Sequence, residues 1–169
     1  MGLSVYDTSI LTLKRGTTTL LNILKKASES ADAASFPDAK LTEDMKPLTF
    51  QVQAASNTAK KTVWRLTGVE TEAWEDNEQT LDQLIARCEK TLALLKGVDP
   101  KQVEGKETAM VELALGPAGT KQLVGTDYIL TYAVPNFFFH LQTAYAILRM
   151  KGVALGKGDY LGPFMTPEA

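Results

Sequence analysis

Four stretches of this sequence place apolar residues at steps of three and four, and this pattern constrains the fold more than any other feature. The stretches cover about residues 9–28, 47–67, 78–96 and 128–151. Such steps put the apolar side chains on one face of an α-helix. Helices of roughly 20 residues, about 30 Å long, can bury those faces only against one another. The sequence therefore predicts an all-α fold, a four-helix bundle.

Residues with strong preferences for helix ends mark the expected boundaries. Pro47 suits the first turn of a helix because its missing N–H costs nothing there. The expected caps of the first and last helices are Asp7-Thr8-Ser9 and Thr126-Asp127, and the expected helix ends are Gly68, Gly97 and Gly152. Pro135 lies inside the last helix and should kink it just before Asn136.

The connections differ in length and composition. Residues 29–47 are rich in Ala, Ser and Asp and predict a surface connection with one short helical turn. The period changes between Lys106 and Gly125, around Gly116-Pro117-Ala118-Gly119, which predicts a small β-hairpin between helices three and four. We expect the other connections to join adjacent antiparallel helices, and residues 153–169 to wrap as a tail.

Length and composition bound the class of protein. A chain of 169 residues predicts a single domain over residues 1–169. With 18 basic and 20 acidic residues, the sequence lacks the excess of positive charge that is typical of nucleic-acid binders. The lone Cys88 predicts a buried apolar filler in a reducing compartment. No apolar run is long enough to span a membrane and no secretory signal is visible, so we expect a cytoplasmic protein without membrane partners.

The one histidine, His140, is the strongest candidate for chemistry. Asn136 lies four residues earlier, so the two share a helix face on which Ala133, Thr143 and Ala144 leave room. A buried Asn–His pair could bind a carbonyl or hydroxyl group and move a proton near neutral pH. The alternative is a core histidine whose hydrogen bonds are satisfied within the bundle.

Further polar residues could complete such a pocket. Gln53 and Asn57 share a face of the second helix, and Gln51 lies near its start. Tyr132 and Tyr145 offer hydroxyl groups from the last helix. The alternative for the amides is solvated surface, and for the tyrosines it is packing. We expect the acidic pairs Glu43-Asp44 and Glu75-Asp76 to be solvated.

Several motifs together resemble one family. They are Asp44-Met45-x-Pro47-Leu48, Gln51-Val52-Gln53-x-Ala55-Ser56, Pro135-Asn136-Phe137-Phe138-Phe139-His140, Thr143-Ala144-Tyr145 and Gly152-Val153-x-Leu155-Gly156-Lys157-x-Asp159-Tyr160-Leu161-Gly162. They look like the family called "domain of unknown function nineteen-ninety-three", in the DinB/YfiT-like superfamily of four-helix bundles. The resemblance implies the fold and leaves the activity open.

The resemblance also implies a test for metal binding. Many members of that superfamily hold a divalent metal with three histidines, one on helix two and two spaced four apart on helix four. This sequence keeps His140, has Ala144 four residues later, and offers Gln51 or Gln53 on helix two. Because a neutral amide is a weak ligand for zinc or nickel, we expect no metal and no cofactor.

Two functions of different kinds remain. The first is a metal-independent bundle that binds a small, largely apolar molecule. It would be an accessory biosynthetic enzyme of the isomerase, cyclase or dehydratase type, with His140 as acid and base. The second is a non-catalytic homodimer that binds or regulates a partner. A metal-dependent transferase or hydrolase is a third and less favoured interpretation. The sequence has no HExxH motif, nucleophile elbow or phosphate-binding glycine loop to support other enzyme classes.

Overall fold

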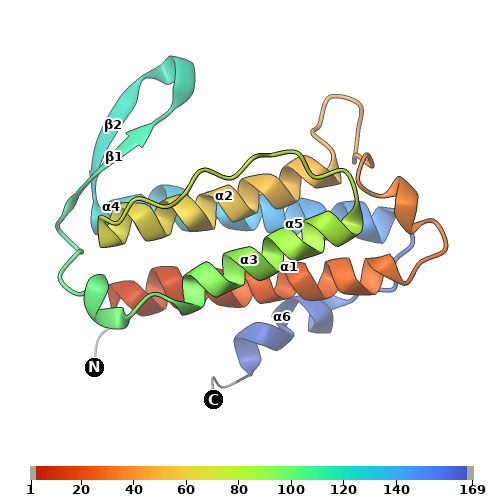
Figure 1. Ribbon diagram of the computed structural model, residues 1–169, viewed down its shortest axis with the longest axis horizontal. Helices are drawn as coiled ribbons and strands as arrows, with labels where there is room; N and C mark the ends of the chain where they lie inside the picture. Colours follow the sequence, from red (N-terminus) through yellow and green to blue (C-terminus); the bar gives the residue numbers. More distant parts are fainter. Residues whose placement is uncertain (1–2, 167–169) are drawn as a thin grey trace.

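The computed structural model describes residues 3–166, and its centre is the predicted bundle of four long helices (Figure 1). The long helices are α1 (Thr12–Ser28), α2 (Leu48–Thr67), α3 (Leu81–Lys96) and α5 (Val134–Met150). Each turns a row of buried aliphatic side chains inward, including Leu20, Val52, Leu84 and Leu141. Burial of these apolar faces is the main force that holds the bundle together.

The order of the helices around the bundle differs from the expected one. Both α1 and α2 pack against α3 and α5, so α1 and α2 lie diagonally opposite each other. Figure 1 shows α2 and α3 running in the same direction, and the connecting residues 69–79 run back along the length of the bundle on its outside. We call this segment the strap. The expectation that this connection joins antiparallel helices is wrong, because an extended chain of about ten residues is long enough, at roughly 3.3 Å per residue, to span a helix.

Local hydrogen bonds fix where the helices begin. The first helix starts earlier than expected: Asp7 N–H donates to Ser4 Oγ (3.0 Å) and Ser4 N–H donates to Asp7 Oδ2 (3.3 Å). This reciprocal pair caps the chain ahead of a π turn, η1 (Asp7–Leu11), which continues into α1. Thr80 and Gln83 form the same kind of cap on α3, two to three residues after the predicted start. Gly68 ends α2 as predicted, in the left-handed conformation with φ 77°.

The predicted β-hairpin is present and antiparallel. Strand β1 (Met110–Ala114) pairs with β2 (Thr120–Val124) in a register that sets Met110 opposite Val124, and the turn η4 (Gly116–Ala118) joins them. Val111 and Leu113 point inward while their neighbours in β1 are exposed. Figure 1 shows the hairpin projecting from one end of the bundle. The other short turns are η2 (Ala33–Ser35), within the connection 29–47, and η3 (Pro100–Gln102).

The last long helix begins before its predicted cap. It starts with α4 (Gly125–Tyr128), so Thr126 and Asp127 lie inside its first turn. A π turn, η5 (Ile129–Ala133), follows, in which Val134 N–H donates to the Ile129 carbonyl. This wider turn comes just before Pro135, which has no N–H to donate to the preceding turn. The helix is open to solvent on one side, where Leu130 and Phe139 are more than half exposed.

The predicted tail is instead a further helix. Residues 157–165 form α6 (Lys157–Met165), which lies along α1. The Thr19 hydroxyl donates to the Tyr160 carbonyl (2.9 Å), and Lys26 pairs with Asp159 (3.1 Å). The sequence interpretation missed this helix because Gly158, Gly162 and Pro163 are poor helix formers, and packing on α1 outweighs that preference. Residues 167–169 of the predicted tail lie outside the described residues.

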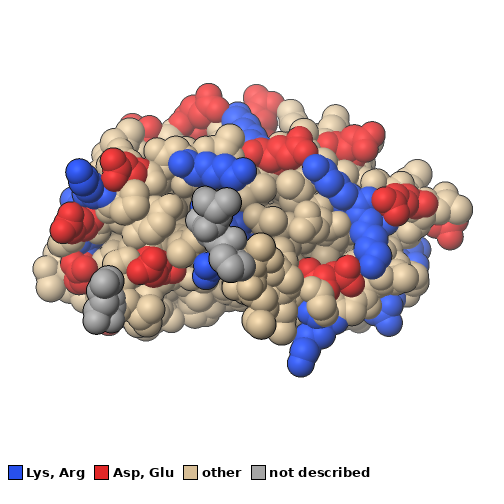
Figure 2. Space-filling view, turned by 90° about the horizontal axis from the view of Figure 1, so that it is seen from below, with Lys and Arg blue, Asp and Glu red and all other residues tan. Residues whose placement is uncertain are grey.

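Among residues 3–166, no helix combines the length and apolar character that crossing a membrane requires. Figure 2 shows basic and acidic side chains interspersed on one face of the molecule.

Candidate functional site

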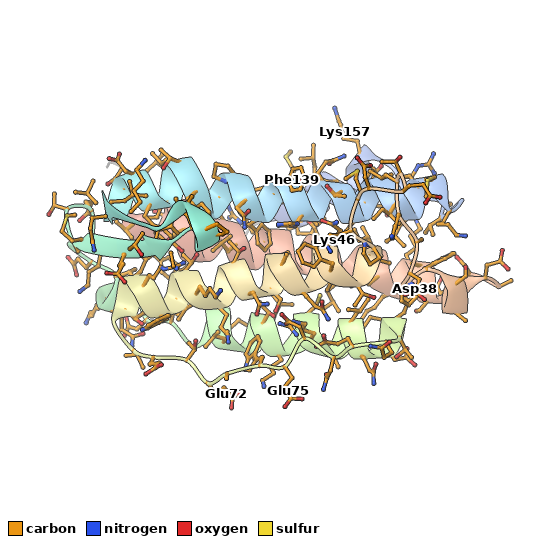
Figure 3. The ribbon with its side chains drawn as sticks, turned by 90° about the horizontal axis from the view of Figure 1, so that it is seen from above. Asp38, Lys46, Glu72, Glu75, Phe139 and Lys157 are labelled. Carbon is orange, nitrogen blue, oxygen red and sulfur yellow. The ribbon has the colours of Figure 1, made fainter. Side chains whose placement is uncertain are left out.

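A small cleft opens between α2 and α5, and it contains most of the polar residues singled out from the sequence. Its volume is about 280 Å³. Figure 3 looks onto the face where α2 and α5 lie side by side, with Lys46 just before α2 and Phe139 on α5. The cleft is lined by Phe50, Gln53, Ala54, Asn57, Thr58, Lys61, Arg65, Asp76, Tyr132, Asn136 and His140.

The hydrogen bonds around Gln51 determine which ring nitrogen of His140 carries the proton. The Gln51 amide nitrogen donates to the Lys46 carbonyl (3.0 Å), which can only accept. This bond turns the Gln51 amide oxygen toward His140 Nδ1, at 2.8 Å. Nδ1 must therefore carry the proton and donate it. The imidazole presents the lone pair of Nε2, which forms no hydrogen bond with the residues that the structure describes.

The surroundings of His140 favour its neutral form. The ring is half-buried, and the rings of Phe50 (5.9 Å between centroids) and Phe139 (5.2 Å) meet it edge-on. Burial lowers the pKa of His140 below its usual value of 6.5, because a charged imidazole loses water there. At neutral pH the site thus holds an unprotonated Nε2.

Asn136 lies one helical turn before His140 and also keeps a free acceptor. Its amide nitrogen donates to the Thr58 hydroxyl (2.8 Å), and that hydroxyl in turn donates to the Ala54 carbonyl (2.7 Å). These bonds fix the orientation of the Asn136 amide. Its oxygen has no hydrogen-bond partner among the described side chains and backbone, so the cleft carries two acceptors from α5.

Gln53 and Asn57 line the cleft but bond in the opposite direction, toward α3. Gln53 donates to Glu78 Oε2 (2.8 Å), and Asn57 donates to the Asp76 carboxylate (3.0 and 3.1 Å). Asn57 also accepts from Arg87, a buried arginine on α3. These two amides therefore fasten the strap as well as facing the cleft.

The two tyrosines differ. Tyr132 lines the cleft and stacks on Tyr128, with 6.2 Å between ring centroids. Tyr145 lies elsewhere, edge-on to Tyr160 of α6, and does not line the cleft. The structure therefore separates Tyr145 from the other residues of the predicted set.

Sequence reasoning missed several residues of this region. Lys61 and Arg65 continue the cleft along α2, and Thr58 orients Asn136. Arg87 binds Asp76 and Glu78 at 2.7 Å each. Glu75 and Asp76 are both exposed, as expected, but the ion pair of Asp76 with Arg87 was not foreseen. One signal was available for Arg87: it lies in the apolar spacing of α3, three residues after Leu84, where a charge requires buried partners.

The donor set does not fit a metal held by three histidines. Among the described residues that line it, the cleft offers one imidazole nitrogen and the unbonded amide oxygens of Gln53 and Asn136, and the one carboxylate, on Asp76, is paired with Arg87. Within residues 3–166, no three His, Cys, Asp or Glu side chains cluster in a way that could hold a metal ion. Zinc sites require three or four strong protein ligands, and the described residues of the cleft do not supply them.

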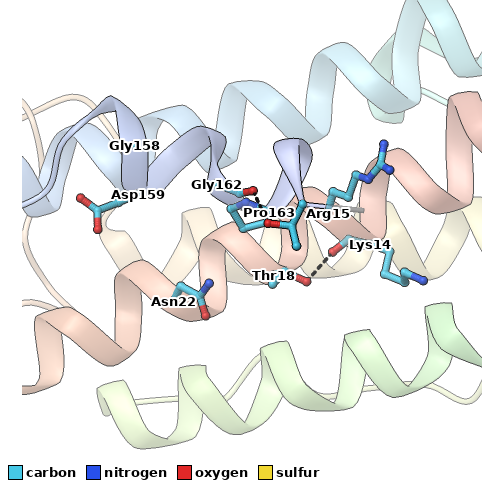
Figure 4. Close-up of a pocket in the computed structure, with 9 residues that line it drawn as sticks. Lys14, Arg15, Thr18, Asn22, Gly158, Asp159, Gly162 and Pro163 are labelled. Carbon is cyan, nitrogen blue, oxygen red and sulfur yellow. Dashed lines mark hydrogen bonds between the residues drawn. The ribbon is translucent and has the colours of Figure 1, made fainter. Parts of the chain in front are cut away.

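Two other grooves are less suited to chemistry. Figure 4 shows α6 lying along α1, with Arg15, Thr18 and Asn22 on the groove between them, whose volume is about 460 Å³. Its threonines bond within their own helices, Thr18 to the Lys14 carbonyl (2.9 Å) and Thr166 to the Gly162 carbonyl (3.0 Å). A third groove of about 540 Å³ beneath the strap has mainly apolar walls and no histidine.

Nucleophilic chemistry has little support in the described chain. Cys88 is fully enclosed in the core, as predicted, and burial raises the pKa of its thiol to about 12. Such a thiol stays protonated and unreactive at neutral pH. His140 lines the cleft and its Nε2 has no hydrogen-bond partner among the described residues, and a neutral imidazole nitrogen of this kind suits proton transfer.

The fold and the α2/α5 cleft define a DinB-like helical bundle, and comparisons with known proteins agree. A DinB family member protein from Shewanella denitrificans superimposes with a TM-score of 0.84 and 32% sequence identity, over 97% of this chain and 95% of that one. Residues 5–161 match the model of the family described as "Domain of unknown function (DUF1993)". The chain belongs to this family. The comparison with curated proteins gives no match.

Proposed function

We propose that the α2/α5 cleft binds a small molecule without a metal and that His140 acts there as a general base. The observation that carries the proposal is the anchored imidazole. Gln51 holds the proton on Nδ1, so Nε2 is the group that faces a ligand as a free base. Histidines in acid–base catalysis are oriented in the same way by an acceptor on the far nitrogen.

The chemistry follows from the groups in the cleft. A ligand O–H, N–H or activated C–H placed against His140 Nε2 would give up its proton to that nitrogen, and the Gln51 oxygen would stabilise the resulting imidazolium. Asn136 would position the ligand through its free oxygen. Proton removal and return without a nucleophile are the steps of isomerisation and dehydration, so we propose a reaction of that class.

The lining changes one part of the sequence hypothesis, which favoured a largely apolar ligand. Most residues around the cleft are polar, and its apolar surfaces are the rings of Phe50 and Tyr132 and the small side chain of Ala54. A ligand with several hydrogen-bonding groups and a compact apolar body matches this lining better.

Carbethoxylation of histidine by diethyl pyrocarbonate tests the proposal directly. The reagent attacks neutral, accessible imidazole and the chain has one histidine, so the absorbance change at about 240 nm reports His140 alone if the protein carries no histidine tag. We expect one modified histidine at pH 7 in the folded protein and none in His140→Gln. A histidine that reacts only after denaturation would refute the accessible base.

A specific observation favours homodimerisation as a second candidate function. Phe139 and Met150 are eleven residues apart on α5, and so share a helix face, and they are 58% and 51% exposed. A second copy packed on this face would remove both side chains from water. Sedimentation equilibrium of the wild type and of Phe139→Ser tests this candidate: a dimer that the substitution converts to monomer supports it, and a wild-type monomer at high concentration contradicts it.

A further inference from the structure

The end of the cleft farther from His140 carries two cations. Lys61 and Arg65 are four residues apart on α2, so both side chains lie on the same face, and both line the cleft. Like charges at this spacing repel each other in an isolated helix. An arrangement of this kind is favourable where an anion lies between or beside the two charges.

Arg65 is held in place by neutral groups. Its Nε donates to the Glu112 carbonyl of β1 (3.2 Å), its Nη1 donates to the Tyr128 hydroxyl (3.2 Å), and the guanidinium lies over the Tyr128 ring at 5.3 Å. These contacts fix its orientation without neutralising its charge. No carboxylate of the described residues forms an ion pair with Arg65.

Lys61 is exposed and likewise has no ion-pair partner among residues 3–166. The one carboxylate in the lining, on Asp76, is already bound to the Arg87 guanidinium (2.7 Å) and to the Asn57 amide. Asp76 and Glu78 of the strap share the single positive charge of Arg87 on α3, and neither forms an ion pair with Lys61 or Arg65. The positive charges of Lys61 and Arg65 remain for a ligand.

The register of the two helices gives the spacing between the charges and the acceptors. Along antiparallel α2 and α5, Gln51 bonds His140, Thr58 bonds Asn136 and Thr62 bonds Tyr128. At about 1.5 Å per residue, Lys61 lies roughly 5 Å along α2 from the Asn136 contact and about 15 Å from the His140 contact. A flexible lysine side chain shortens both distances for a bound molecule.

We infer that the cleft selects a small organic anion, one that carries a carboxylate or phosphate at the Lys61 and Arg65 end and a hydroxyl or amine donor at the Asn136 and His140 end. This inference rests on the proposed function, because it assigns the ligand class of the same site. The volume of about 280 Å³ limits the ligand to a compact molecule.

Matched pairs of probes test the charge requirement. We would titrate the protein with para-hydroxybenzoate, para-hydroxyphenylpropionate and glycolate, and with the neutral amide of each, and follow the NMR signals of the single imidazole. We expect at least one carboxylate to bind about tenfold more tightly than its amide. We also expect its affinity to fall as salt is raised, because exposed charges are screened.

Substitutions of Lys61 test whether its positive charge binds the carboxylate. We expect Lys61→Gln to weaken the carboxylate about fivefold to tenfold, Lys61→Glu to abolish its binding, and both to leave the amide unchanged. Lys101→Gln, on an exposed lysine in η3, removes the same charge outside the cleft and should have no effect. An amide that binds as tightly as its carboxylate, or a carboxylate insensitive to Lys61, would overturn the inference.

The failure of this inference is distinguishable from failure of the proposed function. If His140 reacts with diethyl pyrocarbonate but none of the three carboxylates moves its NMR signals, the anion assignment is overturned and the accessible base stands. If His140 does not react in the folded protein, the proposed function fails and the ligand class fails with it.

Discussion

Polar side chains flank α2 on two sides, and the two groups satisfy their hydrogen bonds differently. Toward α3, the Arg87 guanidinium donates hydrogen bonds to Ser56, Asn57, Glu75 and Glu78, and it also forms an ion pair with Asp76. Toward α5, His140 and Asn136 are each anchored by one bond and keep one acceptor open. We call the Arg87 group the closed set and the His140 and Asn136 group the open set. The closed set stabilises the fold by holding the strap in place, whereas the open set keeps acceptors available to a ligand.

The largest effect should come from breaking the closed set. Arg87 is buried, and Arg87→Met would leave the nearly buried carboxylate of Glu78 without its cation. We expect the free energy of unfolding to fall by about 3–5 kcal/mol, the range for removal of one partner of a buried ion pair. Urea denaturation followed by circular dichroism measures it. Arg87→Lys should restore only part of the loss, and a change below about 1 kcal/mol would show that the strap is held by other contacts.

Substitutions of the two glutamines of α2 should affect the closed set and the open set separately. Gln53→Leu removes the donor to Glu78 and should cost about 1–2 kcal/mol without altering His140. Gln51→Leu removes the acceptor for Nδ1, so the tautomer of His140 is no longer fixed. Nitrogen NMR of the imidazole should show one tautomer in the wild type and in Gln53→Leu, and a mixture in Gln51→Leu. The same tautomer population in all three proteins would contradict the anchoring role of Gln51.

A smaller effect should appear in the pH dependence of stability. Burial lowers the pKa of His140 in the folded protein relative to the unfolded chain, so the unfolded chain binds the proton more readily. The stability associated with neutral His140 is therefore complete above about pH 6.5 and is lost as the pH falls through the folded pKa. Denaturation at several pH values should show a steeper decline below pH 6.5 in the wild type than in His140→Gln. Parallel curves would show that the imidazole titrates normally.

The smallest effect should come from the exposed contacts of the strap. Glu72 pairs with Lys90 at 2.7 Å, and both side chains are at least half exposed. Such pairs contribute little, because water and salt already solvate the charges. We expect Lys90→Gln to change the denaturation midpoint by no more than the error of the measurement. If Lys90→Gln lowered the free energy of unfolding as much as Gln53→Leu does, the contacts of the first half of the strap would stabilise the fold as much as those of the second half.

The fold was predictable where local sequence and packing agree. Gly68 ends α2 and the glycines around residue 117 turn the hairpin, both as predicted. The prediction failed where packing outweighed local preference, as in α6, which contains Gly158, Gly162 and Pro163. It also failed for the order of the helices, because the spacing of apolar residues says which face is buried and not which neighbour buries it.

The candidate site shows the same division. The spacing of four residues was enough to place Asn136 and His140 on one helix face. It could not show that Gln51 and Gln53, two residues apart on α2, serve opposite sides, one bonding His140 and the other Glu78. Nor could it join Lys61 and Arg65 to the histidine, since the antiparallel packing of α2 on α5 forms that cleft.

By itself, the sequence determined a bundle of four amphipathic helices with a hairpin, because helical periodicity and caps act over a few residues. Only the tertiary structure decided which polar groups have hydrogen-bond partners for all their atoms and which keep a free acceptor. A hydrogen bond depends on the distance between two atoms, and for Arg87, Asn136 and His140 the partners come from other segments of the chain. The free Nε2 of His140 is therefore a property of the packed helices and not of α5 alone.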